Sequence, residues 1–307
     1  MAALAPLALI AAVLAGDEVV VVDTTSAVVV RRLALAAEGG GIFAAPDGCL
    51  IVTVPRAGMT LRVRTDWSVE RWPGVLVPVF FDEPDRMYGL FESLLVTLSY
   101  PERLELARRP LPAVRGAFRA ACSRDGQLLG IVPNAPDRRR LVVVTALGDT
   151  PDREIALASE VAHFAMAPGG MWLAAGLVAG AVEVVIAGEP RGRGPTPVGG
   201  QIGGLTSSSD GRDLFVGVAD GKDGRIVCYR VSLKAKEALK RRFATELGAP
   251  VVALSAAGEE VVAATTVGLA LLEKGGKRVR HLVPISGVQA LALLPERAAT
   301  VVPPWSG

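Results

Sequence analysis

Short runs of apolar, β-branched residues alternate with turn-forming residues along the whole chain. One stretch shows the pattern clearly: residues 141–145 read Leu-Val-Val-Val-Thr, and residues 153–157 read Arg-Glu-Ile-Ala-Leu. Runs of this length and composition, bounded by Gly, Pro, Asp or Ser, are typical of β-strands. The pattern therefore predicts an all-β protein.

A turn signal of the Asp-Gly or Pro-Gly-Gly type recurs at intervals of 38 to 48 residues. The centres of the signals are Asp47, Asp85, Asp125, Gly169, Asp210, Gly258 and Glu296. Gly accepts positive φ and Asp bonds its own backbone, so each signal predicts a tight turn between two antiparallel strands. Two further β-rich runs separate successive turns. Four strands in about 42 residues is the period of a β-propeller blade.

The two ends of the chain together supply one complete unit. Residues 7–13, 18–24 and 28–35 predict strands two to four of a blade, and residues 288–294 predict its innermost strand. Residues 298–302 also resemble a second strand and compete with residues 7–13 for that position. We therefore expect one domain, residues 1–307, that forms a seven-bladed propeller with four-stranded antiparallel blades, closed by strands from both termini.

Residues 232–247 interrupt the pattern. Good helix formers replace the β-branched residues there, and the interval between turns reaches 48 residues. Two interpretations stay open: a short helix between strands three and four, or a long β-hairpin arm with a solvated basic face.

The repeat resembles a known type. Residues 18–35 read Glu-Val-Val-Val-Val-Asp-Thr-Thr-Ser followed by a strand rich in Val and Arg. With the preceding turn signals, this is similar to the YVTN-type repeat of bacterial and archaeal seven-bladed propellers, although the Tyr-Val-Thr-Asn tetrapeptide is missing, as are the Gly-His and Trp-Asp pairs of WD repeats. The resemblance implies the fold and leaves the activity open, because one fold hosts many functions.

Composition removes several classes of function. Of 307 residues, 50% are hydrophobic and 21% are charged, which excludes global disorder. The net charge of +2 argues against a nucleic-acid partner. Two histidines and three cysteines cannot build a multi-histidine metal site or a disulfide framework, so we expect no cofactor. Cys49, Cys122 and Cys228 fall in different units and predict free thiols in a reducing, cytoplasmic compartment.

Two apolar segments need separate explanations. Residues 1–16 are uncharged but lack a basic n-region and are shorter than the ~20 residues of a membrane span, so a cleaved signal is the minority interpretation. Residues 161–182 contain Pro168-Gly169-Gly170 at their centre, which indicates a hairpin of two buried strands. We expect no membrane span.

Catalytic motifs are missing from the sequence. The Gly-x-Ser-x-Gly elbow does not occur, and His163 and His281 belong to different strands of different units. The Gly-rich residues 192–204 lack Gly-Lys-Ser/Thr and predict an outer strand and a linker; residues 220–224 predict a turn instead of a calcium loop. The basic runs at 138–140 and 240–242 predict solvated surface, with a local anionic contact as the alternative.

Alternating strand direction places two sets of loops at one mouth of the central channel: those from strand four to the next strand one, and those from strand two to strand three. The polar residues there are Glu38, Arg56, Arg115, Arg119, Asn134, Glu160, His163, Gln201, Asp220 and Gln289. Our ligand-binding candidates are Arg56, Arg115, Arg119, Asn134, Glu160, His163, Gln201 and Gln289. Such a ring suits a peptide or a small anionic ligand; a water-filled channel with ordinary polar walls is the alternative.

These observations predict a non-catalytic binding or scaffolding propeller that recognises a protein, a peptide or a small molecule at the channel mouth. The alternative is an enzyme of hydrolase or lactonase type with its active site at the same mouth. Lactonase propellers hold a metal through Glu, Asn and Asp side chains from several blades, and no motif of those families occurs in this sequence.

Overall fold

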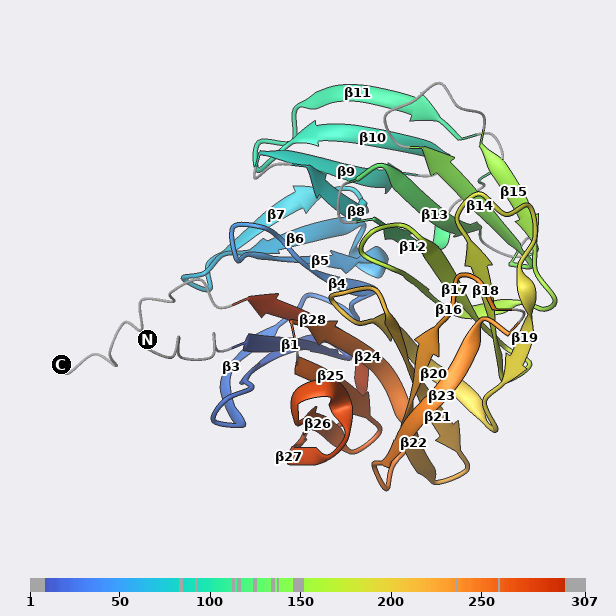
Figure 1. The fold of residues 1–307 in the computed structure, drawn as a ribbon. Coiled ribbons are helices and arrows are strands. Elements are labelled where there is room, and N and C mark those ends of the chain that lie inside the picture. The colour runs from blue at the N-terminus through green and yellow to red at the C-terminus, as the bar shows by residue number, and fades with distance from the viewer. Residues whose placement is uncertain are drawn as a thin grey trace, which may run out of the picture.

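The computed structural model describes residues 9–82, 85–91, 93–111, 114, 117–123, 126–133, 136, 138–145, 152–235, 237–258 and 260–295. Within these residues, seven four-stranded antiparallel sheets surround a common axis (Figure 1). The predicted seven-bladed propeller is confirmed.

We number the blades from the one that contains both chain ends and give each blade's strands from the axis outward. Blade 1 consists of β28 (Val288–Pro295), β1 (Leu9–Ala15), β2 (Glu18–Asp23) and β3 (Val28–Ala34). Blade 2 consists of β4 (Gly41–Ala44), β5 (Leu50–Val54), β6 (Met59–Val63) and β7 (Val69–Pro73). Blade 3 consists of β8 (Val77–Asp82), β9 (Arg86–Phe91), β10 (Leu94–Ser99) and β11 (Glu105–Pro110). Blade 4 consists of β12 (Ala117–Cys122), β13 (Leu128–Pro133), β14 (Arg140–Thr145) and β15 (Arg153–Ala156).

The last three blades follow the same order. Blade 5 consists of β16 (Val161–Met166), β17 (Trp172–Leu177), β18 (Ala181–Ile186) and β19 (Arg193–Pro197). Blade 6 consists of β20 (Gln201–Ser207), β21 (Asp213–Asp220), β22 (Asp223–Val231) and β23 (Leu239–Glu246). Blade 7 consists of β24 (Val251–Ala257), β25 (Glu260–Thr265), β26 (Gly268–Leu272) and β27 (Val279–Pro284).

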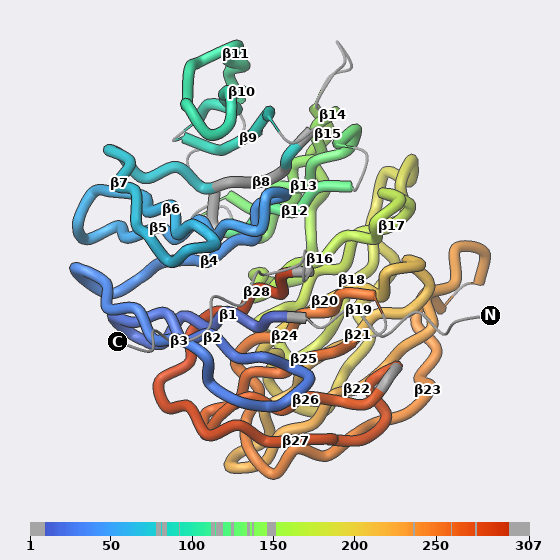
Figure 2. The backbone as a smooth tube through the Cα atoms, turned by 90° about the vertical axis from the view of Figure 1, so that its left-hand side faces the viewer, coloured from blue at the N-terminus to red at the C-terminus, as the bar shows by residue number. Residues whose placement is uncertain are grey.

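Blade 1 closes the ring through strands from both ends of the chain. β1 pairs antiparallel with β28, in a register that runs from Leu9 opposite Pro295 to Ala15 opposite Val288. Both views show the blue strands of residues 9–34 beside the red strands of the C-terminal part (Figure 1; Figure 2). β1 thus fills the second position of the blade, and the competing residues 298–302 lie outside the described residues. Closure covers the inner edge of β1, which an open ring would expose.

The described turns join strand one to strand two, as predicted, at Asp47, Asp85, Gly169, Asp210 and Gly258. The signals centred on Asp125 and Glu296 lie outside the described residues. In blade 6, Gly211 follows Asp210 with φ +67°, a conformation that Gly adopts without a steric penalty. Its amide donates to the carbonyl oxygen of Ser208 at 2.9 Å and closes the turn. The spacing of the turns therefore gives the correct phase of the blades.

Residues 232–247 contain a strand. β23 pairs with β22 over the length of a hairpin arm, so the hairpin interpretation is right and the helix interpretation is wrong. The reason is packing: Leu239 is buried in the core between blades 5 and 6, and Lys240, Arg241 and Arg242 remain exposed. Burial of one face outweighs helix propensity here. Helical structure in the described chain is limited to two three-residue 3-10 turns, η1 (Pro55–Ala57) and η2 (Lys274–Gly276).

The core lies between the blades. Successive residues of β2 point to opposite faces: Val20 and Val22 pack in the cluster shared with blade 7, and Val19 and Val21 pack in the cluster shared with blade 2. A strand that is buried on both faces needs an uninterrupted apolar run, which explains the four consecutive valines.

Side chains of the outer strands donate hydrogen bonds to the next blade. In each case the acceptor is a main-chain oxygen at or after the end of that blade's third strand. The pairs are Arg109 with Thr145 (2.7 Å), Arg153 with Glu189, Arg193 with Leu233 (2.7 Å) and Ala235 (2.6 Å), Thr245 with Gly276 (2.8 Å), and Arg280 with Thr24 (2.7 Å). These peripheral contacts link successive blades outside the apolar core.

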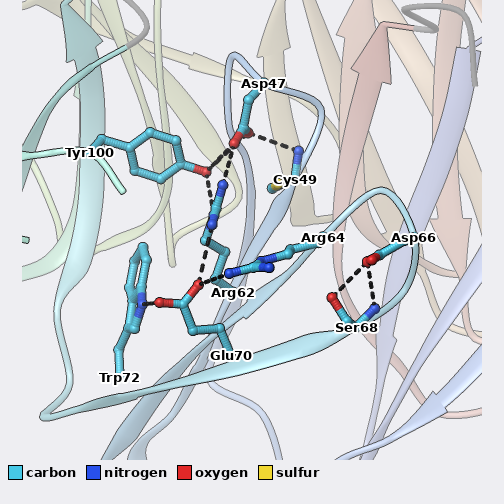
Figure 3. A network of polar contacts seen from close by, with 9 residues as sticks. All are labelled: Asp47, Cys49, Arg62, Arg64, Asp66, Ser68, Glu70, Trp72 and Tyr100. Carbon is cyan, nitrogen blue, oxygen red and sulfur yellow. Dashed lines mark hydrogen bonds and ion pairs between the residues drawn. The ribbon is translucent and has the colours of Figure 1, made fainter. Parts of the chain in front are cut away.

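Blades 2 and 3 share a buried polar cluster instead (Figure 3). Arg62 on β6 is only 8% exposed; its Nε donates to the Tyr100 hydroxyl at 3.0 Å, and its Nη2 donates to Asp47 at 2.7 Å. The Tyr100 hydroxyl donates to Asp47 at 2.9 Å. Burial opposes ionisation of Asp47, but the hydrogen bonds from Arg62 and the Cys49 amide outweigh it and hold the pKa of this carboxyl below its usual value.

Candidate functional site

One face of the ring carries both sets of loops that the sequence places at the channel mouth, and we call it the mouth face. In every blade, a main-chain amide just after strand four donates to a carbonyl oxygen at the strand-two-to-three connection. The seven bonds, donor first, are Gly39 to Gly16, Gly74 to Gly58, Leu111 to Ser93, Leu157 to Arg139, Val198 to Gly180, Leu247 to Gly224 and Ile285 to Val267. The two sets of loops therefore lie side by side around the ring.

A first group of candidates meets where blades 1 and 2 join. Gln289 on β28 donates its amide to Oε1 of Glu38 at 2.7 Å, and Arg56 in η1 lies 3.2 Å from Oε2 of the same carboxylate. Each carboxylate oxygen of Glu38 therefore has one polar partner, and the side chain of Arg56 is 78% exposed. The group is a surface ion pair extended by one amide, which contributes little to stability.

A second group lies at the seam between blades 4 and 5. The register of β16 shifts between Val161 and His163, so Ala162 forms a bulge, and the carbonyl oxygen of Ala162 accepts a hydrogen bond from Nε of Arg119 on β12 at 3.4 Å. The amide of Val161 donates to the carbonyl oxygen of Arg138 at 3.1 Å, which fixes the strand-two-to-three connection of blade 4 against the start of β16. Arg119, Arg138 and His163 therefore gather at one seam.

The basic groups of this seam influence one another. Burial and the nearby charge of Arg119 lower the pKa of His163 to about 4, so the imidazole is neutral at neutral pH. Burial and the charge of Arg138 lower the pKa of Arg119. The residue Arg119 is nevertheless exposed to solvent. Arg119 is the third residue of the innermost strand β12, close to the mouth face where the strand begins.

A third group lines a groove between blades 5 and 6. The groove has a volume of about 640 Å³ and is formed by residues 178–180, 197, 199–201 and 219–221. It contains two of the polar residues expected at the mouth, Gln201 and Asp220, and the exposed apolar side chain of Val178. The size lies in the range typical of ligand pockets.

The floor of the groove is main chain. A Cβ atom at Gly200 would lie 2.7 Å from the carbonyl oxygen of Ala219, so only glycine permits this close approach of the linker to β21. Arg225 on β22 supports the linker: its Nη2 donates to the carbonyl oxygen of Gly199 at 2.7 Å, and its Nη1 lies 3.5 Å from Asp220. The Asp220 side chain stays 63% exposed.

The remaining candidates do not extend these groups. Glu160 is exposed just before β16, and its carbonyl oxygen accepts the Val178 amide at 2.8 Å. Arg115 and Asn134 lie outside the described residues. His281 is exposed on the outer strand β27, and the two histidines belong to different blades, as predicted.

Sequence reasoning missed two residues. At residues 138–140, where the sequence predicts solvated surface or a local anionic contact, Arg139 is exposed, and Arg138 is half-buried beside Arg119. The position of Arg138 in the connection between strands two and three is the sequence signal that places it at the channel mouth. Arg225 gave no signal, because its role depends on the neighbouring linker.

The residues that the structure describes contain no group of three or more His, Cys, Asp or Glu side chains placed to hold a metal ion. No helix in the same part of the chain has the length and hydropathy needed to cross a bilayer.

Comparisons with known proteins define the class by fold. No protein-family profile and no curated sequence matches the chain. Among solved structures, a functionally unknown protein from Desulfotomaculum acetoxidans superposes with a TM-score of 0.71 at 11% identity, covering 94% of this chain and 99% of that one. Kuenenia stuttgartiensis hydrazine synthase superposes with a TM-score of 0.67 at 12% identity, covering 85% of this chain and 90% of that one. A chain of the Mitotic Checkpoint Complex superposes with a TM-score of 0.65 at 14% identity, covering 83% of each chain. At these identities the likeness shows the seven-bladed propeller fold, and the YVTN-type repeat stays a sequence resemblance.

Proposed function

We propose that this protein is a non-catalytic binding or scaffolding propeller that recognises its partner at the mouth face. The groove between blades 5 and 6 is the observation that carries the proposal, because it unites Gln201 and Asp220 with a volume of about 640 Å³. We infer a protein or peptide partner, with a small molecule as the alternative occupant.

The chemistry of the groove suits a short extended peptide. Val178 offers an exposed apolar contact, Gln201 offers an amide, and Asp220 offers a carboxylate, while the glycine-rich floor brings main-chain groups close to the occupant. Binding sites of this kind combine apolar contact with a few polar groups that fix orientation.

The acid–base properties of the mouth favour binding over the hydrolase or lactonase alternative. His163 is the histidine of the mouth face, and a pKa of about 4 makes its imidazole a weak base at neutral pH. General bases work best when their pKa lies near the operating pH. The arrangement around His163 is thus better suited to contact with a ligand than to proton abstraction.

Fold relatives and composition are compatible with an assembly role. A propeller of similar fold forms part of the Mitotic Checkpoint Complex, which is a property of that protein and a precedent for this one. The net charge of +2 gives no general attraction for nucleic acid. Free thiols at Cys49, Cys122 and Cys228 fit a reducing, cytoplasmic location.

Site-specific photo-crosslinking tests the proposal. A benzophenone amino acid replaces Gln201 on the mouth face, or Arg212 in the turn between β20 and β21 on the opposite face, where the arginine side chain is 72% exposed. In an extract of the native cells, the probe at 201 should give a discrete adduct and the probe at 212 should not. The replacement Asp220→Ala should reduce the adduct at 201 severalfold. A discrete adduct from position 212 alone would show that the partner binds the opposite face.

A further inference from the structure

The hairpin between β21 and β22 places two carboxylates beside the groove of blades 5 and 6. In its register Asp220 lies directly opposite Asp223. The turn between them is Gly221-Lys222. Directly opposite residues of an antiparallel pair share one face of the sheet, with Cβ atoms about 5 Å apart. The two carboxylates are therefore neighbours at the tip of the hairpin, where both residues are exposed.

The alternation of side chains shows that this face of the hairpin is the one toward blade 5. Asp223, Arg225 and Val227 occupy alternate positions of β22, so their side chains share a face. Val227 is buried in the core between blades 5 and 6. Arg225 donates from Nη2 to the carbonyl oxygen of Gly199, in the linker that lines the groove, at 2.7 Å. Asp220 shares the face of its partner Asp223, so both carboxylates lie on the side of blade 6 that borders the groove.

Negative charge is in excess at this end of the groove. The guanidinium of Arg225 is shared, because its Nη2 is bonded to the linker and its Nη1 lies 3.5 Å from Asp220. The side chain of Asp223 has no ion pair or hydrogen bond with the residues that the structure describes. Beside the groove, Glu160 and Lys222 are exposed and carry opposite charges. Three carboxylates thus accompany two cationic side chains, and one negative charge is left without a partner.

A basic side chain of a peptide matches both the charge and the surface of the groove. Lys and Arg combine an apolar stem with a cationic head. Val178 is 58% exposed on the wall of the groove and can contact the stem, while Asp220 and Asp223 offer carboxylate oxygens to the head. Like charges that lie directly opposite each other destabilise a β-ladder. A cation bound between the two carboxylates therefore also relieves their mutual repulsion.

We propose that the groove between blades 5 and 6 binds a Lys or Arg side chain of the peptide partner. Asp220 and Asp223 accept charge-assisted hydrogen bonds from its cationic head, and Val178 contacts its apolar stem. The inference rests on the proposed binding function and names the class of residue that the partner presents at this point.

Titration of the ¹⁵N-labelled full chain with short peptides tests this assignment. The probes are acetyl-Ala-Arg-Ala-amide, its citrulline analogue, which has a similar shape without the charge, and CaCl2. The readout is the position of each main-chain amide signal in a TROSY spectrum. The Arg peptide should move the signals of residues 199–201 and 220–223. It should bind at least about tenfold more tightly than the citrulline peptide, and a tenfold change in Kd corresponds to about 1.4 kcal/mol. Equal Kd values for the two peptides would overturn the assignment.

Variants test whether the two carboxylates carry the preference. Asp223→Asn alone should weaken binding of the Arg peptide about threefold or more, as expected for one exposed ion pair. Asp220→Asn combined with Asp223→Asn should give the Arg and citrulline peptides the same Kd. Asp17→Asn is the matched control and should leave the Kd unchanged, because Asp17 is exposed in the corresponding strand-two-to-three turn of blade 1. A double variant that melts at the wild-type temperature and still prefers the Arg peptide would refute the assignment.

Failure of this assignment is distinguishable from failure of the proposed function. If the Arg and citrulline peptides move the amides of residues 199–201 with equal Kd, the groove binds peptides but does not select a basic residue. If CaCl2 moves residues 220–223 at lower concentration than the Arg peptide does, the carboxylates serve a metal ion and the assignment is wrong. The crosslinking experiment at position 201 tests the binding function independently. Tight binding of the Arg peptide without any adduct at 201 would contradict a cellular partner and leave the preference for a basic side chain intact.

Discussion

Removal of one hydroxyl group, by Tyr100→Phe, tests whether the polar cluster between blades 2 and 3 stabilises the ring. Tyr100 is 3% exposed, and its hydroxyl accepts from Arg62 and donates to Asp47. Its ring also meets Phe81 and Trp72 edge-on, with centroids 5.2 and 6.2 Å away, and the phenylalanine ring keeps these contacts. The substitution thus isolates the contribution of the hydrogen bonds.

The expected change in the free energy of unfolding depends on the hydrogen bonds that Arg62 and Asp47 lose. A hydrogen bond to a charged group contributes about 1.5–3 kcal/mol. Asp47 is half-buried and keeps its bonds to Arg62 and to the Cys49 amide, so water can replace the lost donor cheaply. Arg62 is 8% exposed, and its Nε loses its acceptor. We expect the free energy of unfolding to fall by about 2–3 kcal/mol, mostly through the buried guanidinium.

Urea denaturation followed by tryptophan fluorescence measures this change, because Trp72 lies in the cluster. Tyr229→Phe is the matched control: Tyr229 is 5% exposed on β22, and its hydroxyl has no hydrogen-bond partner in the described chain. The control should change the free energy of unfolding by less than about 0.5 kcal/mol. A Tyr100→Phe variant as stable as the Tyr229→Phe variant would show that the cluster contributes nothing measurable.

Four further predictions follow from the fold. Arg193→Ala removes hydrogen bonds to the connection after β22 and should lower the midpoint of urea denaturation; an unchanged midpoint would contradict a stabilising role for the peripheral contacts. Deletion of residues 287–307 removes β28 and should lower the melting temperature far more than loss of a frayed tail, so a wild-type melting curve would refute closure. Val in place of Gly126 or Gly211, with φ of +71° and +67°, should destabilise by about 1 kcal/mol or more; unchanged stability of both variants would mean the turns are misassigned. The pKa of His163 is about 4 in the folded protein, below its ordinary value of 6.5, so the unfolded chain binds the proton at a higher pH than the folded chain does. The free energy of unfolding should therefore fall as the pH drops from about 6.5 to 4. His163→Gln should remove this part of the pH dependence, as measured by denaturation at each pH.

Local chemistry explains why the architecture could be predicted from the sequence. Turn residues such as Asp210 and Gly211 determine the conformation of a four-residue turn. The apolar run of β2 indicates a strand that is buried on both faces. These signals repeat in each blade, so their spacing gives the number and phase of the blades. Closure of the ring could also be predicted, because residues 288–294 supply the innermost strand that the incomplete unit at the start of the chain lacks.

Tertiary packing decided the features that local signals left open. Helix propensity at residues 232–247 was outweighed because Leu239 is buried between two blades. The partners at the mouth are distant in sequence: Gln289 meets Glu38 across 251 positions, and Arg119 meets Ala162 across 43. The sequence placed these residues on one face, but their grouping into an ion pair, a basic seam and a groove depends on how neighbouring blades pack. Charge interactions and burial fall off over a few ångströms, so the low pKa of His163 and the fixed linker beside Asp220 exist only in the assembled ring.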